Sequence, residues 1–178
     1  MAIIQQKQKQ IWVLLGAECT GKSTLATYWA QHLGALLLDE FSRTWVENNQ
    51  RAVSDDDVAE LVAGQMAQDC LALNSTQPVV MDTNLINTLA YAHHYHQQAP
   101  QQITQHLQQY AQHSQYIVCA ADIPWKIQQY TRPAHDNRIH INQSIINLLK
   151  QYGCTYQIVS GSIDTRIMQL KKYSNQTR

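Results

Sequence analysis

The sequence has few charged residues and no excess of either sign. Charged side chains make up 15% of its 178 residues, and 13 Lys and Arg balance 13 Asp and Glu. A chain without net charge exerts no overall field toward nucleic acid or an anionic membrane. We therefore expect no nucleic-acid partner, while a local cationic site remains compatible with the composition.

Paired cysteines and long apolar runs are also missing. The four cysteines stand at 19, 70, 119 and 154, and no two of them form a Cys-x-x-Cys pair. Such spacing supports neither a zinc site nor a disulfide framework. No apolar run approaches the roughly 20 residues that span a bilayer, and Met1–Gln10 has only a short apolar stretch before Gln and Lys take over, unlike a signal peptide. These absences predict a cytoplasmic protein without membrane insertion.

Short apolar runs alternate with longer amphipathic stretches, which is the pattern of β-α units on a parallel sheet. The predicted strands are Ile11–Leu15, Ala35–Leu38, Pro78–Met81, Tyr116–Ala120 and Thr155–Val159. Each run is continuously apolar, as is typical of strands covered on both faces. The predicted helices are Lys22–Leu33, Asp55–Leu73, Leu85–Gln97, Gln101–His113, Ile139–Tyr152 and Ile163–Tyr173.

A glycine-bounded loop follows the first predicted strand directly. It reads Gly16-Ala17-Glu18-Cys19-Thr20-Gly21-Lys22-Ser23-Thr24 and fits G-x-x-x-x-G-K-[ST] without deviation. Its glycines let successive backbone N–H groups point at phosphate oxygens, and the following helix adds the positive end of its dipole. Lys22 would reach the β- and γ-phosphates, and Ser23 would offer its hydroxyl to Mg²⁺. The whole loop is therefore a predicted ATP site.

This placement of the loop predicts an α/β protein of the P-loop NTPase class, a three-layer sandwich with a five-stranded parallel sheet. We expect one domain over residues 1–178, with residues 1–10 as an N-terminal extension, because no internal repeat or long linker divides the chain. A GTPase would need Asn-Lys-x-Asp and Asp-x-x-Gly motifs, and neither is present. The length favours a small nucleoside- or nucleotide-type kinase with a lid over a large mechanical ATPase.

Carboxylates follow two predicted strands, and the carboxyl ends of parallel strands face the ligand crevice. Asp39 and Glu40 come after the second strand, and Asp82 comes after the third, followed by Thr83 and Asn84. One acid can accept the proton of a substrate hydroxyl, and Asp82 can orient Mg²⁺ directly or through water. The sequence leaves open whether Glu40 or Asp82 takes the proton. Acids that only cap the next helix are the alternative for Asp39 and Glu40.

A polar segment at about 123–138 has the features of a lid and carries Trp125, Arg132 and Arg138. Phosphoryl transfer needs positive charge on the migrating oxygens and exclusion of water. We therefore expect Arg132 and Arg138 to touch phosphate, with a solvated surface as the alternative. Trp125 would stack on a substrate ring or pack at the root of the lid.

The last predicted strand ends in Ser160-Gly161-Ser162, which leads into a helix that carries Arg166. Many P-loop kinases wrap the adenine ring at this place, with backbone atoms and an arginine face. Gly161 and Arg166 are therefore predicted to bind ATP, and a simple helix N-cap is the alternative.

Taken together, these residues resemble the ribosylnicotinamide kinase domain of the NadR family. The matching stretches are Gly16–Leu25, Glu40-Phe41-Ser42-Arg43, Ala63-Gly64-Gln65, Val80-Met81-Asp82-Thr83-Asn84, Asp122–Trp125 with Arg132 and Arg138, and Asp164–Arg166. They follow the family order and cover nearly the whole chain. Two places depart from the family: Asp39 stands where an aromatic residue often precedes the Glu, and Gln128-Gln129-Tyr130 replaces a lid Asp-Gly pair.

The resemblance implies an ATP- and Mg²⁺-dependent kinase that phosphorylates the 5′-hydroxyl of nicotinamide riboside, giving nicotinamide mononucleotide in NAD salvage. Within it, Lys22 and Ser23 would handle the phosphates and Mg²⁺, and Arg132 and Arg138 would clamp the phosphates. The substrate-binding set that we predict is Asp39, Glu40, Arg43, Asp82, Thr83, Asn84 and Trp125.

A carboxylate such as Asp39 would favour the cationic pyridinium ring over neutral nucleosides. Two alternatives remain at this stage: a kinase for another nucleoside or deoxynucleoside, and a regulatory P-loop ATPase that transfers phosphate to nothing. The sequence does not indicate an oligomeric state.

Overall fold

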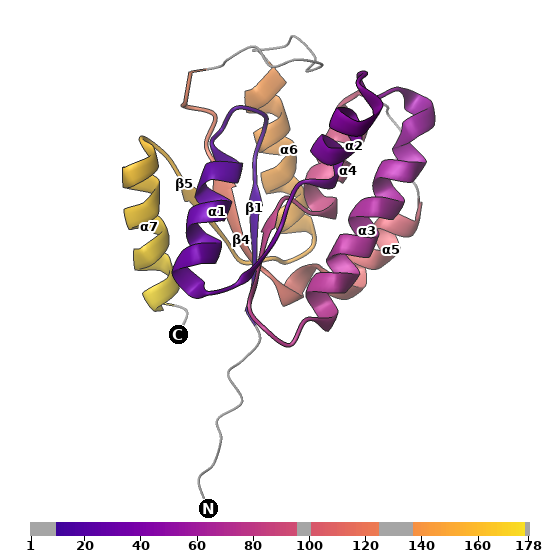
Figure 1. The fold of residues 1–178 in the computed structure, drawn as a ribbon. Helices are drawn as coiled ribbons and strands as arrows, with labels where there is room; N and C mark the ends of the chain where they lie inside the picture. The colour runs from indigo at the N-terminus through magenta and orange to yellow at the C-terminus, as the bar shows by residue number, and fades with distance from the viewer. Residues whose placement is uncertain (1–9, 96–100, 125–136, 177–178) are drawn as a thin grey trace, which may run out of the picture.

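The chain forms one parallel β-sheet between two layers of helices (Figure 1). The structure is a computed structural model, and it describes residues 10–95, 101–124 and 137–176. The strands are β1 (Ile11–Leu15), β2 (Leu36–Leu38), β3 (Val79–Asp82), β4 (Gln115–Cys119) and β5 (Tyr156–Val159). The helices are α1 (Lys22–Leu33), α2 (Phe41–Asn49), α3 (Val58–Asn74), α4 (Leu85–Tyr95), α5 (Gln101–Tyr110), α6 (Asn137–Gln151) and α7 (Ile163–Gln176), with 3₁₀ turns at η1 (Asp55–Asp57) and η2 (Ala111–His113).

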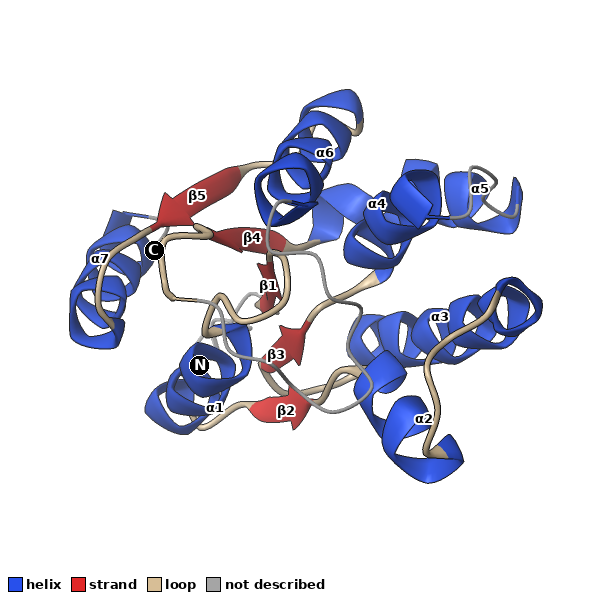
Figure 2. Cartoon of the chain, turned by 90° about the horizontal axis from the view of Figure 1, so that it is seen from above, coloured by secondary structure: helices blue, strands red, loops and turns tan. Residues whose placement is uncertain are grey.

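The strand order is β2-β3-β1-β4-β5, and every neighbouring pair is parallel. In the register of β1, Leu14 lies beside Asp82 of β3 and Ile117 of β4. Helices α1 and α7 cover one face of the sheet, and α3, α4, α5 and α6 cover the other (Figure 2). The phosphate loop therefore leaves the sheet between the carboxyl ends of β3 and β4.

Alternate residues of β1 build the two cores of the sandwich. Val13 and Leu15 belong to the core beneath α3–α6, whereas Trp12 and Leu14 pack with α1 and α7. The Trp12 ring meets Trp29 edge-on, with ring centroids 5.4 Å apart. All residues of β1 are buried, so the strand that carries the phosphate loop is fixed from both sides.

Helix α2 was not among the predicted elements, and it is joined to α3 by an ion-paired turn. Its sequence, FSRTWVENN, contains few strong helix formers, and Trp45 is its one buried residue. Beyond its end, Arg51 donates two hydrogen bonds to Asp57, at 2.6 and 2.7 Å, and its guanidinium lies over the Trp45 ring. The Ser54 N–H donates to the same carboxylate at 2.8 Å, and Ser54 and Asp57 form a capping box at η1, directly before α3.

Strand β1 and helix α1 have the predicted bounds, and the other predicted elements shift by a few residues at their ends. The expectation that every strand is covered on both faces is wrong for β2 and β5. These are the edges of the sheet, where Leu36 is 37% exposed and Ile158 is 43% exposed. An apolar run therefore marks a strand without showing its position in the sheet.

The phosphate loop and the ends of the described chain lie at opposite ends of the strands, the loop at the carboxyl ends and the chain ends toward the amino ends (Figure 1). The chain enters β1 at Ile11 and leaves α7 at Gln176, both far from the loop between β1 and α1 (Figure 1). None of the helices within the described ranges combines the length and apolar character needed to cross a membrane.

Candidate active site

The loop Gly16–Thr24 turns sharply between β1 and α1. Gly16 and Gly21 have φ angles of 144° and 77°, and Cys19 is also left-handed at 54°. A Cβ added to Gly16 would lie 2.8 Å from the Cys119 carbonyl oxygen, so only glycine fits there. Gly21 is the N-cap of α1 and has no side chain to cap the helix. The first N–H groups of α1 are therefore suited to an anion.

Asparagines from two distant helices hold the first residues of the loop. Asn142 of α6 accepts the Ala17 N–H at 2.7 Å and donates to the Cys119 carbonyl at 2.9 Å. Asn87 of α4 accepts the Gly16 N–H at 3.3 Å. Both side chains are buried, so they fix the backbone direction at the end of β1.

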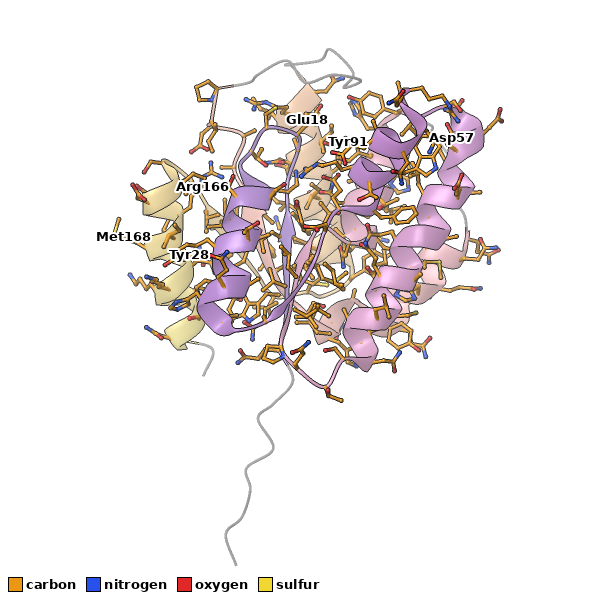
Figure 3. The ribbon with its side chains drawn as sticks, in the orientation of Figure 1. Glu18, Tyr28, Asp57, Tyr91, Arg166 and Met168 are labelled. Atoms are coloured by element: carbon orange, nitrogen blue, oxygen red, sulfur yellow. The ribbon has the colours of Figure 1, made fainter. Side chains whose placement is uncertain are left out.

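Arg166 holds the other end of the loop. Its side chain is 0% exposed and donates to the carbonyls of Thr20, Ala120 and Gly161 at 2.8, 3.1 and 2.9 Å. It also pairs with the Asp122 carboxylate, which accepts the Gly161 N–H at 2.6 Å. Figure 3 labels it on α7, facing α1. A guanidinium that is completely buried and whose three nitrogens all donate to protein groups offers no exposed face to adenine, so the structure assigns Arg166 to the support of the loop.

Arg138 of α6 has a similar place behind the loop. Its side chain is 4% exposed and donates to the carbonyls of Cys19 and Ala121 at 3.4 and 3.2 Å, and twice to Ile123 at 3.0 Å. Arg138 thus ties the loop to the root of the predicted lid. Trp125, Arg132 and the rest of the lid from 125 to 136 lie outside the described residues.

Charged and polar groups meet where β2 and β3 end. Arg43 donates to Ser23 Oγ and to Glu40 Oε2, both at 2.8 Å, and its Nη1 is 3.7 Å from Asp82 Oδ2. Ser42 donates its hydroxyl to Glu40 Oε1 at 2.9 Å. The sheet brings these groups together because Glu40 and Asp82 follow neighbouring parallel strands.

Asp82 is the most buried acid of this cluster, with 2% of its side chain exposed. Burial raises the pKa of its carboxyl group, and the positive charge of Lys22 opposes that rise. Its Oδ1 is buried and has no hydrogen-bond partner among the described residues. An oxygen left in this state points to a further partner for the carboxylate.

The residues at this point fit Mg²⁺. A serine hydroxyl and a carboxylate are oxygen ligands of the kind that the ion prefers, and Mg²⁺ usually binds through one or two carboxylates together with substrate phosphates. Ser23 and Asp82 provide these groups, and the unpartnered Asp82 Oδ1 is accounted for by such an ion. No group of three or more His, Cys, Asp or Glu side chains with metal-binding geometry occurs in the described part of the chain.

Glu18 of the loop is bound by Tyr91 of α4, as Figure 3 shows. The Tyr91 hydroxyl accepts the Glu18 N–H at 3.1 Å and donates to the Glu18 carboxylate. Burial raises the pKa of Tyr91 well above its ordinary value, and the negative charge of Glu18 adds to the rise. Tyr91 is therefore a permanent hydrogen-bond donor to Glu18 at neutral pH.

A cavity of about 1070 Å³ lies between the phosphate loop and helices α2, α3 and α4. One wall is polar and contains the loop residues from Glu18 to Thr24, together with Glu40 and Arg43. The opposite wall is largely apolar and contains Val46, Val53, Val58, Leu61, Tyr91 and Tyr95. A polar end with phosphate-directed groups and an apolar end are what a nucleotide and a second, ring-bearing substrate need.

The predicted site residues take different positions relative to the cavity. The cavity is lined by Glu18–Thr24, Glu40, Arg43 and Thr83. Asp82 lies behind Ser23 and Arg43. Asp39 is exposed and is not part of the cavity wall.

Asn84 is also not part of the cavity wall, because it is buried at the start of α4. There it accepts the Ile86 N–H at 3.0 Å and donates to the Tyr116 hydroxyl at 3.3 Å. Asp39 and Asn84, both predicted to bind the substrate, therefore lie outside the wall of this cavity.

Thr83 has a strained backbone at the edge of the cavity. Its φ angle is 77°, a left-handed conformation that is a genuine outlier for a β-branched residue. Its N–H donates to the Leu14 carbonyl at 3.0 Å, which fixes the chain directly after Asp82. Such strain persists where surrounding structure enforces it, and it is concentrated at functional sites.

Comparisons with known proteins agree with this architecture. Residues 11–166 match the family described as an AAA domain, AAA_28, and because the match covers most of the chain, the chain belongs to that family. No curated protein sequence matches it. Among solved structures, 122 chains match its fold.

Three of these structures illustrate the fold that the chain shares with them. A NadR protein in complex with NAD and AMP-PNP is 19% identical with a TM-score of 0.65, over 88% of this chain and 45% of that chain. Thymidylate kinase from Ehrlichia chaffeensis is 13% identical with a TM-score of 0.68, over 94% and 98% of the two chains. Deoxyadenosine kinase from M. mycoides with bound dATP is 13% identical with a TM-score of 0.65, over 93% and 99%.

These likenesses confirm the predicted fold class, and they confirm the resemblance to the NadR P-loop domain at the level of the fold. The chain spans less than half the length of the NadR chains that it matches.

Proposed function

We propose that the protein transfers the γ-phosphate of ATP to the hydroxyl group of a small nucleoside-type substrate, with nicotinamide riboside as the preferred acceptor. The observation that carries this proposal is that one cavity contains both the phosphate loop and the Glu40 carboxylate. The nucleotide would lie with its phosphates on Gly16–Thr24, and the acceptor would lie between Glu40 and the apolar wall.

The phosphate loop has the groups that phosphoryl transfer needs. The N–H groups at the start of α1 would face the β- and γ-phosphates, and Lys22 is 6% exposed, with Nζ 2.8 Å from the Ala17 carbonyl oxygen. A lysine held within its own loop can turn to the phosphates with little reorganisation. Mg²⁺, held by Ser23 and Asp82, would neutralise charge that develops on the phosphoryl oxygens.

Glu40 is better placed than Asp82 to accept the proton of the acceptor hydroxyl. Glu40 lines the cavity and its side chain is 19% exposed, whereas Asp82 is 2% exposed and lies behind Ser23. A general base must come within hydrogen-bond reach of the proton that it removes. Ser42 and Arg43 hold both oxygens of Glu40, so the carboxylate has a fixed direction.

The charges in the cavity favour a cationic ring. Among the described residues, three carboxylates line it, from Glu18, Glu40 and Glu47, and they face Lys22 and Arg43. When Lys22 is neutralised by phosphate, this described part of the wall is net negative. This supports a pyridinium ring, as in nicotinamide riboside, and it transfers to Glu18 and Glu47 the role that the sequence suggested for Asp39.

The test is phosphotransfer from ATP to a panel of acceptors, with each product identified by mass. Nicotinamide riboside should have the highest kcat/KM in a panel with uridine, thymidine and deoxyadenosine. Its reduced dihydro form has a similar shape without the positive charge. It should be a poorer acceptor, by about fivefold, because an ion pair open to solvent contributes up to about 1 kcal/mol. Equal turnover of the two forms would contradict the assignment to a cation.

Kinases for other nucleosides are the second candidate. The fold matches thymidylate kinase and deoxyadenosine kinase over nearly their whole lengths. Faster turnover of a neutral nucleoside in the same panel would favour this candidate. ATP consumption that no acceptor increases would contradict both and indicate a regulatory ATPase.

A further inference from the structure

Arg43 contacts the same two residues that fit Mg²⁺. From α2 its guanidinium reaches Ser23 Oγ at 2.8 Å and lies 3.7 Å from Asp82 Oδ2. The same group donates to Glu40 at 2.8 Å. One positive charge therefore joins the predicted metal ligands to the candidate general base.

A divalent ion and this position of Arg43 exclude each other. Mg²⁺ binds oxygen at about 2.0–2.1 Å with nearly ideal octahedral geometry, so an ion on Ser23 and Asp82 would need the space beside the guanidinium. Two cations at such a separation also repel each other. The Arg43 side chain is 47% exposed, so it can move into the cavity or into solvent at low cost.

We propose that Arg43 is a stand-in cation that keeps the metal ligands and Glu40 in place and is displaced when Mg²⁺ enters with the nucleotide. The proposal rests on the proposed function, because it concerns the same site. Its consequence is an order of events: metal-nucleotide binding removes the ion pair from Glu40 and so frees that carboxylate to accept a proton. The Ser42 hydroxyl bonds the other Glu40 oxygen and would keep its direction after Arg43 leaves.

The displacement predicts a specific effect on metal dependence. Wild-type protein must break the Arg43 contacts when ATP binds with Mg²⁺, but it need not break them for ATP in EDTA. The ratio of ATP affinity in Mg²⁺ to ATP affinity in EDTA is therefore the quantity to compare. Arg43→Gln should raise this ratio by at least about tenfold, because the repulsion between like charges a few ångströms apart near a protein surface exceeds the free energy of one factor of ten.

The experiment is calorimetric titration of ATP into four proteins, each with Mg²⁺ and with EDTA. The proteins are the wild type, Arg43→Gln, Arg43→Lys and Arg51→Gln. Arg51 is a matched control, because it is 49% exposed, pairs with Asp57 beyond the end of α2, and does not line the cavity. Arg43→Lys, which keeps the charge, and Arg51→Gln should both retain a ratio near that of the wild type.

Two results would overturn the inference. An unchanged ratio in Arg43→Gln would mean that Arg43 does not compete with the ion, and a lower ratio would mean that Arg43 helps to bind the metal-nucleotide complex. Neither result affects the proposed function, since ATP would still bind. A wild-type protein that bound no ATP under either condition would overturn both proposals.

Discussion

The guanidinium of Arg166 donates to the carbonyl oxygen of Thr20 at 2.8 Å, across 146 residues of sequence. The last helix thereby fixes the phosphate loop from behind. Arg138 holds the neighbouring Cys19 carbonyl in the same manner. Arg138, which the sequence suggested as a phosphate ligand, and Arg166, which it suggested as an adenine contact, thus hold carbonyl groups of the loop, while the N–H groups at the start of α1 remain suited to the phosphates.

This arrangement predicts that Arg166→Lys weakens the binding of every polyphosphate equally. The shorter amine cannot reach all the carbonyls that Arg166 holds, so the loop loses order, and affinity should fall about tenfold, the worth of one hydrogen bond from a charged group. Titration with ATP and with inorganic tripolyphosphate measures the effect, and circular dichroism checks the fold. A loss confined to ATP would instead show that Arg166 contacts adenine.

Gly64 lets Phe41, the residue after Glu40, pack on α3. A Cβ added to Gly64 would overlap carbon atoms of the Phe41 ring. Gly64→Ala should therefore displace the start of α2 and lower kcat at least tenfold through Glu40, since small displacements of a catalytic group cost about this much or more. Steady-state kinetics of Gly64→Ala, Phe41→Leu and the double variant test this.

The smaller leucine side chain should restore part of the activity in the double variant. If Phe41→Leu gave no recovery in the Gly64→Ala background, the effect of the alanine would have to arise elsewhere on α3.

The amide variants of Glu40 and Asp82 should have different kinetic effects. Glu40→Gln removes the proton acceptor, so kcat should fall by about 10² or more with little change in the Mg²⁺ requirement. Asp82→Asn should raise the Mg²⁺ concentration that gives half-maximal rate, because a metal ligand loses its charge. Rate measurements over a Mg²⁺ series distinguish the two, and identical Mg²⁺ curves for Asp82→Asn and the wild type would remove Asp82 from the metal site.

At Thr83, which has a left-handed backbone, the glycine variant should be more stable than the alanine variant, the reverse of the usual order of stability. Alanine in this conformation costs about 1–2 kcal/mol, while glycine adopts it freely but loses more chain entropy. Thr83→Gly should therefore be more stable than Thr83→Ala, by up to about 1 kcal/mol. Urea unfolding measures both, and the same pair at the exposed Thr27 of α1 should show the ordinary order, with alanine more stable.

Asp69 of α3 should make stability depend on pH. Burial raises its pKa to about 7, against a stabilising hydrogen bond from Gln65. Because the folded pKa is raised, the stabilisation is complete below about pH 4 and is lost as pH rises through about 7, a change of up to about 4 kcal/mol. The free energy of unfolding of the wild type minus that of Asp69→Asn should fall over this range.

His106, whose Nε2 lies 3.7 Å from Asp69 Oδ2, has a pKa lowered by burial and acts in the opposite sense. The subtraction removes most of its contribution, because His106 is present in both proteins. A difference that stayed constant between about pH 4 and pH 8 would show that Asp69 is charged in the folded state.

The elements around the phosphate loop could be predicted closely because local chemistry defines their ends. A buried strand, two glycines and a lysine at the first turn fix β1 and α1 to the residue. Helix α2 lacks such signals: its cap residue Glu40 makes no side-chain cap bond, and its sequence has weak helix propensity. Packing of Phe41 against Gly64 helps to place this helix, and a single sequence does not show that contact.

The candidate site was predictable where residues are consecutive and was missed where it depends on tertiary contacts. Asn87, Tyr91 and Asn142 are isolated polar residues on helices, and nothing in their spacing marks them. Arg138 and Arg166 were identified from their charge, but their burial and carbonyl partners decide what they do. The sequence shows that a side chain is charged, but only the tertiary structure shows which groups that side chain contacts and therefore what it does.

The described chain starts next to β1 and ends in α7, and both points lie at the end of the strands opposite the phosphate loop (Figure 1). A fluorophore or surface tether attached at either of these points would therefore face away from the nucleotide. Immobilised molecules would keep their binding cavity open to bulk solution, so nucleotide exchange could be followed one molecule at a time without steric interference from the attachment.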